Sequence, residues 1–176
     1  MATTKWTIDP THTDIQFKVK HLMVTTVTGH FKKFEGQVES SNDDFSEAKV
    51  TFTADISSID TGAPDRDTHL RSADFFELEK YPQLKFSSTA FKKLDEHNYE
   101  LSGDLTIRGV TKPVKLKAEY AGRAKDPWGN TKAAFGLEGK INRKDFGLTW
   151  NAPLEAGGVL VSEEVRLLAE VQLVQA

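Results

Sequence analysis

The stretch "YELSGDLTIRGVTKPVKLKAEYAG", residues 99–122, decides the fold class of this chain. Apolar or small residues recur at every second position along it: Tyr99, Leu101, Gly103, Leu105 and Ile107, then Val114, Leu116, Ala118 and Tyr120. A period of two is the pattern of a strand with one buried face. We therefore expect two strands, separated by a turn at "GVTKP", residues 109–113.

The same alternation recurs along most of the chain. It is found in "DIQFKVKH" (14–21), "FEGQVES" (34–40), "KVTFTADISSI" (49–59), "LKFSSTAF" (84–91), "AAFGLEGKINR" (133–143) and "EVRLLAEVQLV" (164–174). No long amphipathic helix lies between these segments, so parallel βαβ units are not expected. The pattern predicts an all-β fold of about eight antiparallel strands, as a sandwich or a barrel. Closure into a barrel is favoured because it removes exposed edges.

Several of the predicted inward rows contain a small residue. These are Gly36, Ala54, Ala90, Gly103, Ala118, Gly139 and Ala169. An eight-stranded barrel is just wide enough to fill itself or to hold one small ligand. The small residues either leave room for such a ligand or alternate with large ones to fill a tapering interior. Both interpretations stay open at this point.

Composition limits the possible functions. With 176 residues the chain suits one domain, residues 1–176. A net charge of −3 gives no field that attracts phosphates, so we expect no nucleic-acid partner. The absence of cysteine excludes disulfides, thiolate metal sites and cysteine nucleophiles.

The start "MATTKWTIDPTH" lacks the basic and apolar segments of a secretory leader. No apolar run approaches the roughly 18 residues of a membrane span. We therefore expect a soluble cytoplasmic protein without a membrane span.

Catalytic and metal motifs are missing from the sequence. The histidines at 12, 21, 30, 69 and 97 show no metal-ligand spacing. There is no nucleophile elbow, and neither a phosphate-binding nor a dinucleotide fingerprint. The sequence thus nominates no catalytic residue, no metal ligand and no cofactor.

One segment, "APDRDTHLRSADFFELEKYPQLKF" at residues 63–86, interrupts the alternation. Pro64 followed by acidic residues suits the first turn of a short helix that continues to about Arg71. Asp67 and Arg71 could pair across one turn of it. So short a helix must dock on something, and Phe75 and Phe76 are the obvious means.

Two polar residues of this helix have alternative interpretations. Arg66 and His69 could hydrogen-bond a ligand at the end of an apolar cavity. They could equally bond a carboxylate and a backbone carbonyl and so fix the loop. The residues alone do not decide between these roles.

Five blocks of the sequence, in this order, closely resemble the YceI-like family. They are "WTIDPTHTDIQFKVKHLMVTTVTGHF", "RDTHLRSADFFELEKYPQLKF", "YELSGDLTIRGVTKPVKL", "INRKDFGLTWN" and "VSEEVRLLAEVQL". The likeness extends from Trp6 nearly to the C-terminus.

The resemblance implies an eight-stranded antiparallel lipocalin-like β-barrel, with a short helical excursion near residues 63–78. It implies non-enzymatic binding or transport of a long apolar amphiphile in an elongated tunnel, such as a polyisoprenoid, an isoprenoid quinone or a fatty-acid derivative. It also implies a homodimer. Many relatives carry a leader and are periplasmic, whereas this chain shows none.

Carried onto this sequence, the resemblance predicts which residues surround the ligand. The tunnel wall is expected to consist of Phe17, Val19, Phe34, Phe52, Ile56, Phe86, Leu101, Leu105, Phe135 and Ile141. An end or side wall is expected from Phe75, Phe76, Phe146 and Trp150, and a polar end from His12, Arg66, His69 and Asn151. "INRKDFG" is interpreted as a turn fixed by Asn142, Arg143 and Asp145.

Two alternatives accompany this hypothesis. The first is an enzyme that acts on an apolar substrate in the same cavity, with His69 or His12 as acid–base group. The second is a filled barrel that acts as an interaction module, in which each inward Phe is ordinary core.

Overall fold

The computed structural model describes residues 3–42, 44–151 and 160–176. The strands are β1 (Thr4–Ile8), β2 (Asp14–His21), β3 (Thr25–Phe31), β4 (Phe34–Ser40), β5 (Lys49–Asp55), β6 (Ile59–Asp60), β7 (Gln83–Lys93), β8 (Asn98–Ile107), β9 (Val110–Lys125), β10 (Thr131–Asn142) and β11 (Val161–Gln175). The helical segments are η1 (Pro10–His12), η2 (Ile56–Ser58), α1 (Pro64–Arg71) and η3 (Arg143–Phe146). The predicted helix thus begins at Pro64 and ends at Arg71.

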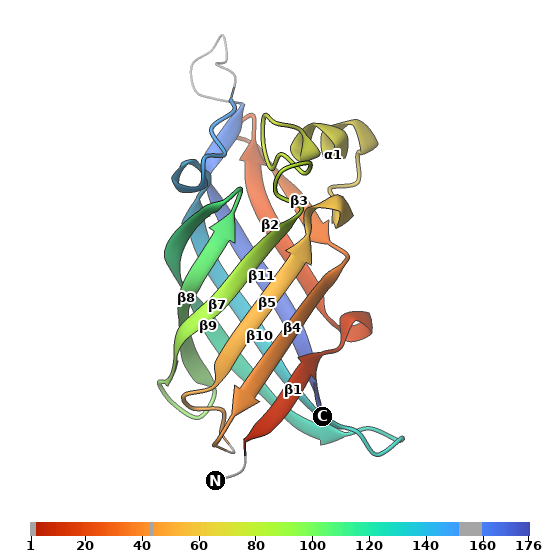
Figure 1. The fold of residues 1–176 in the computed structure, drawn as a ribbon, viewed down its shortest axis with the longest axis vertical. Helices are drawn as coiled ribbons and strands as arrows, with labels where there is room; N and C mark the ends of the chain where they lie inside the picture. Colours follow the sequence, from red (N-terminus) through yellow and green to blue (C-terminus); the bar gives the residue numbers. More distant parts are fainter. Residues whose placement is uncertain (1–2, 43, 152–159) are drawn as a thin grey trace.

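The sheet closes on itself (Figure 1). Its order is β1-β4-β5-β7-β8-β9-β10-β11, and β11 pairs again with β1, which makes a closed barrel of eight described strands. Every described pairing is antiparallel. Strand β2 pairs with the other half of β11, and β3 and β6 continue from it. The predicted all-β, eight-stranded antiparallel barrel is confirmed.

The hairpin of β8 and β9 is tighter than its sequence predicted. Ile107 pairs with Val110, so the turn consists of Arg108 and Gly109 alone. Their φ angles are 51° and 73°, as in the two-residue turns whose twist matches that of the flanking strands. The predicted turn at 109–113 is therefore too long, because β9 already begins at Val110.

A bulge changes the predicted pattern of β7. The register shifts between Ser88 and Ala90, which exchanges the two faces of the strand beyond that point. Phe91 is consequently buried, and Ala90, predicted to face inward, is exposed. Similarly, β5 ends at Asp55 and gives way to η2, whereas the sequence predicted a strand to residue 59.

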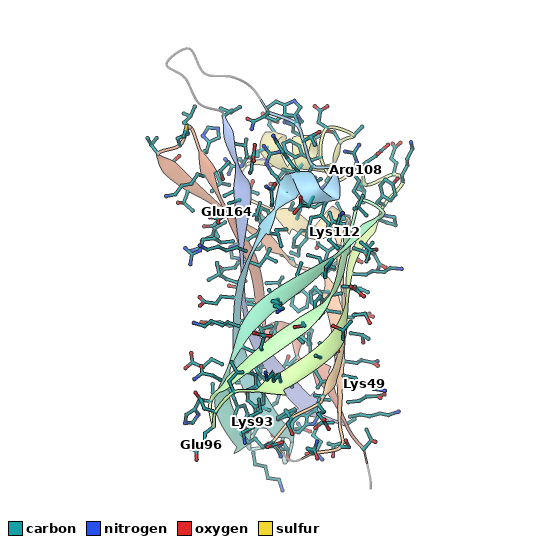
Figure 2. All side chains as sticks on the ribbon, turned by 90° about the vertical axis from the view of Figure 1, so that its left-hand side faces the viewer. Lys49, Lys93, Glu96, Arg108, Lys112 and Glu164 are labelled. Atoms are coloured by element: carbon teal, nitrogen blue, oxygen red, sulfur yellow. The ribbon has the colours of Figure 1, made fainter. Side chains whose placement is uncertain are left out.

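The barrel has two different ends. The chain termini and the β9–β10 turn lie at the lower end in Figure 1, and α1 lies at the upper end. Arg108 and Lys112 lie near the upper end, and Lys93 and Glu96 near the lower one (Figure 2). Charged side chains point outward from the wall between them. No helix among the described residues is long and apolar enough to cross a membrane.

Candidate functional site

A cavity of about 250 Å³ occupies the interior of the barrel, and its surface is almost entirely apolar. It is bordered by Val161 at the start of β11 and by Leu173 near the C-terminal end of that strand, and by Phe45 and Leu148 from loops. A cavity of about 150 Å³ holds a benzene ring, and ligand pockets usually measure about 300–1,000 Å³. The space therefore suits a narrow apolar chain better than a bulky ligand.

Most of the predicted wall residues border this cavity. Those that do are Phe17, Val19, Phe52, Phe86, Leu101, Leu105, Phe135 and Ile141, together with Phe75 and Phe76 of the predicted end wall. Four other predicted residues lie elsewhere: Phe34 packs on Phe52, Ile56 and Phe146 are buried in the core, and Trp150 packs on Phe75.

Several cavity residues were missed by the sequence prediction. They include Ile8, Phe31, Phe45, Leu70, Phe91 and Leu148. Ile8 belongs to a strand of only five residues, and Phe91 is brought inward by the bulge in β7. Phe45, Leu70 and Leu148 lie outside the strands, where a period of two gives no signal.

The small inward residues mostly serve packing. A Cβ atom on Gly36 would lie 2.3 Å from Ile8 Cδ1, and one on Gly103 would lie 2.5 Å from Phe86 Cζ. A Cβ atom on Gly139 would lie 2.3 Å from Leu116 Cδ2. These glycines accommodate neighbouring side chains, as in a tapering interior. Of the predicted set, Ala169 borders the cavity itself.

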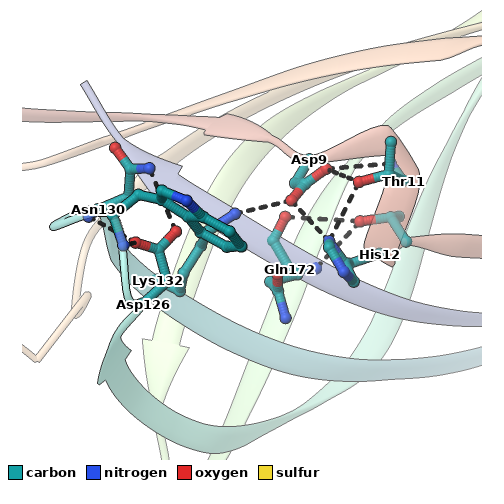
Figure 3. A network of polar contacts seen from close by, with 9 residues as sticks. Asp9, Thr11, His12, Asp126, Asn130, Lys132 and Gln172 are labelled. Atoms are coloured by element: carbon teal, nitrogen blue, oxygen red, sulfur yellow. Dashed lines mark hydrogen bonds and ion pairs between the residues drawn. The ribbon is translucent and has the colours of Figure 1, made fainter.

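His12, predicted at the polar end, lies on the outside of the barrel (Figure 3). Its side chain is 62% exposed, and its Nδ1 is 2.9 Å from an Asp9 carboxylate oxygen. Lys132 Nζ lies 2.7 Å from the same oxygen. The Lys132 hydrogen bond is the main reason that the pKa of Asp9 lies far below its usual value, with Thr11 and His12 contributing. This network joins η1 to β10.

Arg66 is directed toward the chain that precedes α1. Its Nε donates to Thr61 Oγ1 at 2.7 Å and its Nη2 to the Thr61 carbonyl at 2.6 Å. Asp67 accepts hydrogen bonds from the Thr61 amide and hydroxyl at 2.9 and 2.6 Å. The predicted pair of Asp67 and Arg71 is not formed. The Asp67 carboxylate accepts from Thr61 instead, and Arg71 donates to the Ile59 carbonyl.

His69 and Asn151 also make contacts within the loops of the upper end. His69 Nε2 is 2.8 Å from an Asp74 carboxylate oxygen, and its ring packs edge-on against Phe75 and Trp150. Asn151 donates to the Val161 carbonyl at 2.7 Å and accepts from the Val161 amide at 3.0 Å. Neither residue borders the cavity, and the same is true of His12 and Arg66.

The buried charge that does border the cavity is Arg143, at the start of η3. Its side chain reaches four backbone carbonyls, those of Leu148, Trp150, Val161 and Ser162. Burial lowers its pKa from the usual value. The sequence placed Arg143 in a turn, which is correct, but gave no sign that the guanidinium turns inward.

Within residues 3–42, 44–151 and 160–176, no three or more His, Asp or Glu side chains gather in a way that could hold a metal ion. The interior therefore offers an almost entirely apolar surface, and Arg143 is the buried charged residue among those that border it.

Comparisons with known proteins agree with this architecture. The sequence profile described as the YceI-like domain matches residues 6–173. A UPF0312 protein of Photorhabdus laumondii is 48% identical over 135 residues, which cover 77% of this chain and 70% of that protein.

Two solved structures share the fold. The YCEI protein of Campylobacter jejuni has a TM-score of 0.76 and 35% identity, covering 88% of each chain. A polyisoprenoid-binding domain from Saccharophagus degradans has a TM-score of 0.65 and 14% identity, covering 97% of this chain and 98% of that one.

Proposed function

The chain belongs to the YceI-like family, and we propose that it binds the hydrocarbon chain of a long amphiphile inside its barrel. The ligand class is a polyisoprenoid, an isoprenoid quinone or a fatty-acid derivative. One observation carries the proposal: an apolar cavity lies inside the barrel, bordered both by Val161 at the start of β11 and by Leu173 near its end. The structural likeness to a domain described as polyisoprenoid-binding supports the choice of an isoprenoid hydrocarbon as ligand.

The energy of binding would come from buried apolar surface. Each buried methylene contributes about 0.8 kcal/mol, and association costs about 4–15 kcal/mol. A chain of several isoprene units can therefore reach micromolar affinity, whereas a short one cannot. Affinity should rise with chain length until the cavity is filled.

Binding without catalysis is part of the proposal. No histidine of the described residues borders the cavity, and His12 and His69 are held by Asp9 and Asp74 outside it. The two histidines that an enzyme was expected to use as acid–base groups are therefore not placed beside the cavity. A homodimer and a cytoplasmic location stay predictions, which light scattering and cell fractionation would check.

The proposal can be tested by placing a larger side chain on β11, where it would fill the cavity. Ala169 borders the cavity, and Glu170 is exposed on the opposite face of β11. Ala169→Phe should weaken binding of trans-farnesol at least about tenfold, because the ring occupies the space of the chain. Glu170→Phe, the matched control, should bind as the wild type does. Calorimetric titration measures both, and equal binding by all three proteins would refute the proposal.

A further inference from the structure

Arg143 is held in an unusual way for a buried charged residue. It is only 3% exposed. Nε donates to the Ser162 carbonyl at 2.8 Å, and Nη1 donates to the Leu148 and Trp150 carbonyls at 2.6 and 2.8 Å. Nη2 donates to the Val161 carbonyl at 3.2 Å. A guanidinium has five N–H donors, so these four bonds leave one N–H, on Nη2, without an acceptor among the described residues.

The guanidinium of Arg143 makes no ion pair with a carboxylate of the described residues, and the charge of Glu163 acts on it only from beyond ion-pair distance, where it raises the pKa of Arg143 against the lowering by burial. Across the described part of the chain, no Asp or Glu lies within ion-pair distance of it. The neighbouring acid Glu163 is engaged by Lys144, whose Nζ lies 2.7 Å from it. Backbone carbonyls satisfy hydrogen bonds but carry no net charge. A buried cation without a directly paired carboxylate is costly, and Arg143 is among the residues that border the apolar cavity.

We propose that Arg143 binds an anionic oxygen of the amphiphile, a carboxylate or a phosphate ester, at the upper end of the cavity. The proposal rests on the proposed function and adds the class of headgroup and the direction of the chain. The head lies at Arg143 and the tail extends toward Phe45 and Leu173. The remaining Nη2 N–H supplies a charge-assisted hydrogen bond, which is about twice as strong as a neutral one.

A purely structural role makes a different prediction. The four carbonyl contacts join the segment from Leu148 to Trp150 to the start of β11. If Arg143 served only to hold these segments together, ligands with the same chain would bind equally well whatever their head. Discrimination between heads is therefore the decisive readout.

The first experiment uses the wild-type protein and three ligands with one chain: trans-farnesol, farnesoic acid and farnesyl monophosphate. At pH 7.5 we expect the anionic ligands to bind at least about tenfold more tightly than the alcohol, as a hydrogen bond to a charged group predicts. A preference for the acid alone or the phosphate alone identifies the source of the anionic oxygen. Equal affinity for all three ligands overturns the proposal and leaves chain binding standing.

Variants of Arg143 test whether this residue causes the preference for anionic heads. Arg143→Gln should remove the preference for anionic heads while retaining binding of farnesol, and Arg143→Lys should keep part of the preference. Arg66→Gln is the matched control, because Arg66 also bonds a backbone carbonyl at the upper end without bordering the cavity. It should keep the full preference.

The outcomes separate the two proposals. If no farnesyl ligand binds the wild type, chain binding fails and the head site fails with it. If Arg143→Gln does not fold, the wild-type preference and the Arg143→Lys variant still decide. A preference that persists unchanged in Arg143→Lys and Arg143→Gln assigns it to another residue and overturns the role of Arg143.

Discussion

The two ends of the barrel are built differently. At the lower end, aromatic rings pack on one another: Phe45 lies 5.1 Å from Trp6 and 5.2 Å from Phe135 between ring centroids. The Arg123 guanidinium stands over the Trp6 and Phe45 rings at 5.3 and 4.9 Å. Trp6 and Phe45 are each 1% exposed. Ring packing closes this end.

At the upper end, polar side chains fix loops by bonding to the backbone. Arg143 reaches four carbonyls, Arg66 bonds Thr61, and Arg108 donates to the Gly147 carbonyl at 2.7 Å. The lower end is closed by ring packing. At the upper end, the ring cluster of His69, Phe75 and Trp150 is accompanied by arginine side chains that hydrogen-bond the loop backbone around the cavity.

The largest effect should follow from opening the lower end. Phe45→Ala removes a fully buried ring that contacts Trp6, Tyr120 and Phe135. We expect the free energy of unfolding to fall by about 3–5 kcal/mol, measured by urea denaturation. Leu94→Ala, at a side chain that is 54% exposed, is the control and should change it by less than about 0.5 kcal/mol. A loss below 1 kcal/mol for Phe45→Ala would contradict the comparison of the two ends.

Overpacking the wall between the ends should have a smaller effect. A Cβ on Gly103 would lie 2.5 Å from Phe86 Cζ and 2.6 Å from the Ser87 carbonyl oxygen, whereas one on Gly136 meets no atom within 4 Å. Gly103→Ala should cost about 1–3 kcal/mol of unfolding free energy, and Gly136→Ala should not destabilise. Equal melting temperatures of the two variants would show that the wall adapts freely.

Because of the Asp9 network, the free energy of unfolding should depend on pH in the acidic range. The folded pKa of Asp9 is lowered from 3.8, chiefly by Lys132. The stabilisation is therefore complete above about pH 4 and is lost as the pH falls through the folded pKa. Asp9→Asn should lower the unfolding free energy by about 2 kcal/mol at pH 7, and the difference from the wild type should shrink between pH 4 and 2. Denaturation curves across this range check it, and a constant difference would contradict it.

The smallest effect is expected at the upper end, for His69. The side chain of Asp74, its partner, is 53% exposed, and pairs as exposed as this contribute about 0–1 kcal/mol. Asp74→Asn should therefore change the unfolding free energy by less than about 1 kcal/mol and leave farnesol affinity unchanged. A tenfold change in affinity would show that His69 acts on the cavity after all.

Much of the fold follows from a period of two. The rows of β8, β9, β10 and β11 were predicted correctly because each has one apolar face. The closing strand β1 was missed because it has only five residues, and β3 because threonines dilute its pattern. The bulge in β7 depends on pairing with β8, which local sequence does not encode.

The candidate site was predictable where strands build it. Phe52, Phe86 and Leu105 were predicted at the wall and border the cavity. Its polar end was not predictable, because it depends on how loops fold over the barrel. The Arg143 side chain bonds carbonyls of residues up to 19 positions further along the sequence. No local sequence pattern predicts such contacts. The motif "EAGGV", residues 155–159, is typical of a turn between strands, but it lies outside the described residues.

The most direct measurement is where a bound chain lies. With methyl-labelled protein and unlabelled farnesol, intermolecular NOEs should reach Leu101, Leu105 and Leu173, which border the cavity and are 3%, 7% and 2% exposed. The methyls of Leu22 and Leu94, which are 44% and 54% exposed, should show none. NOEs confined to these exposed methyls, or absent from the interior at saturating farnesol, would contradict the account.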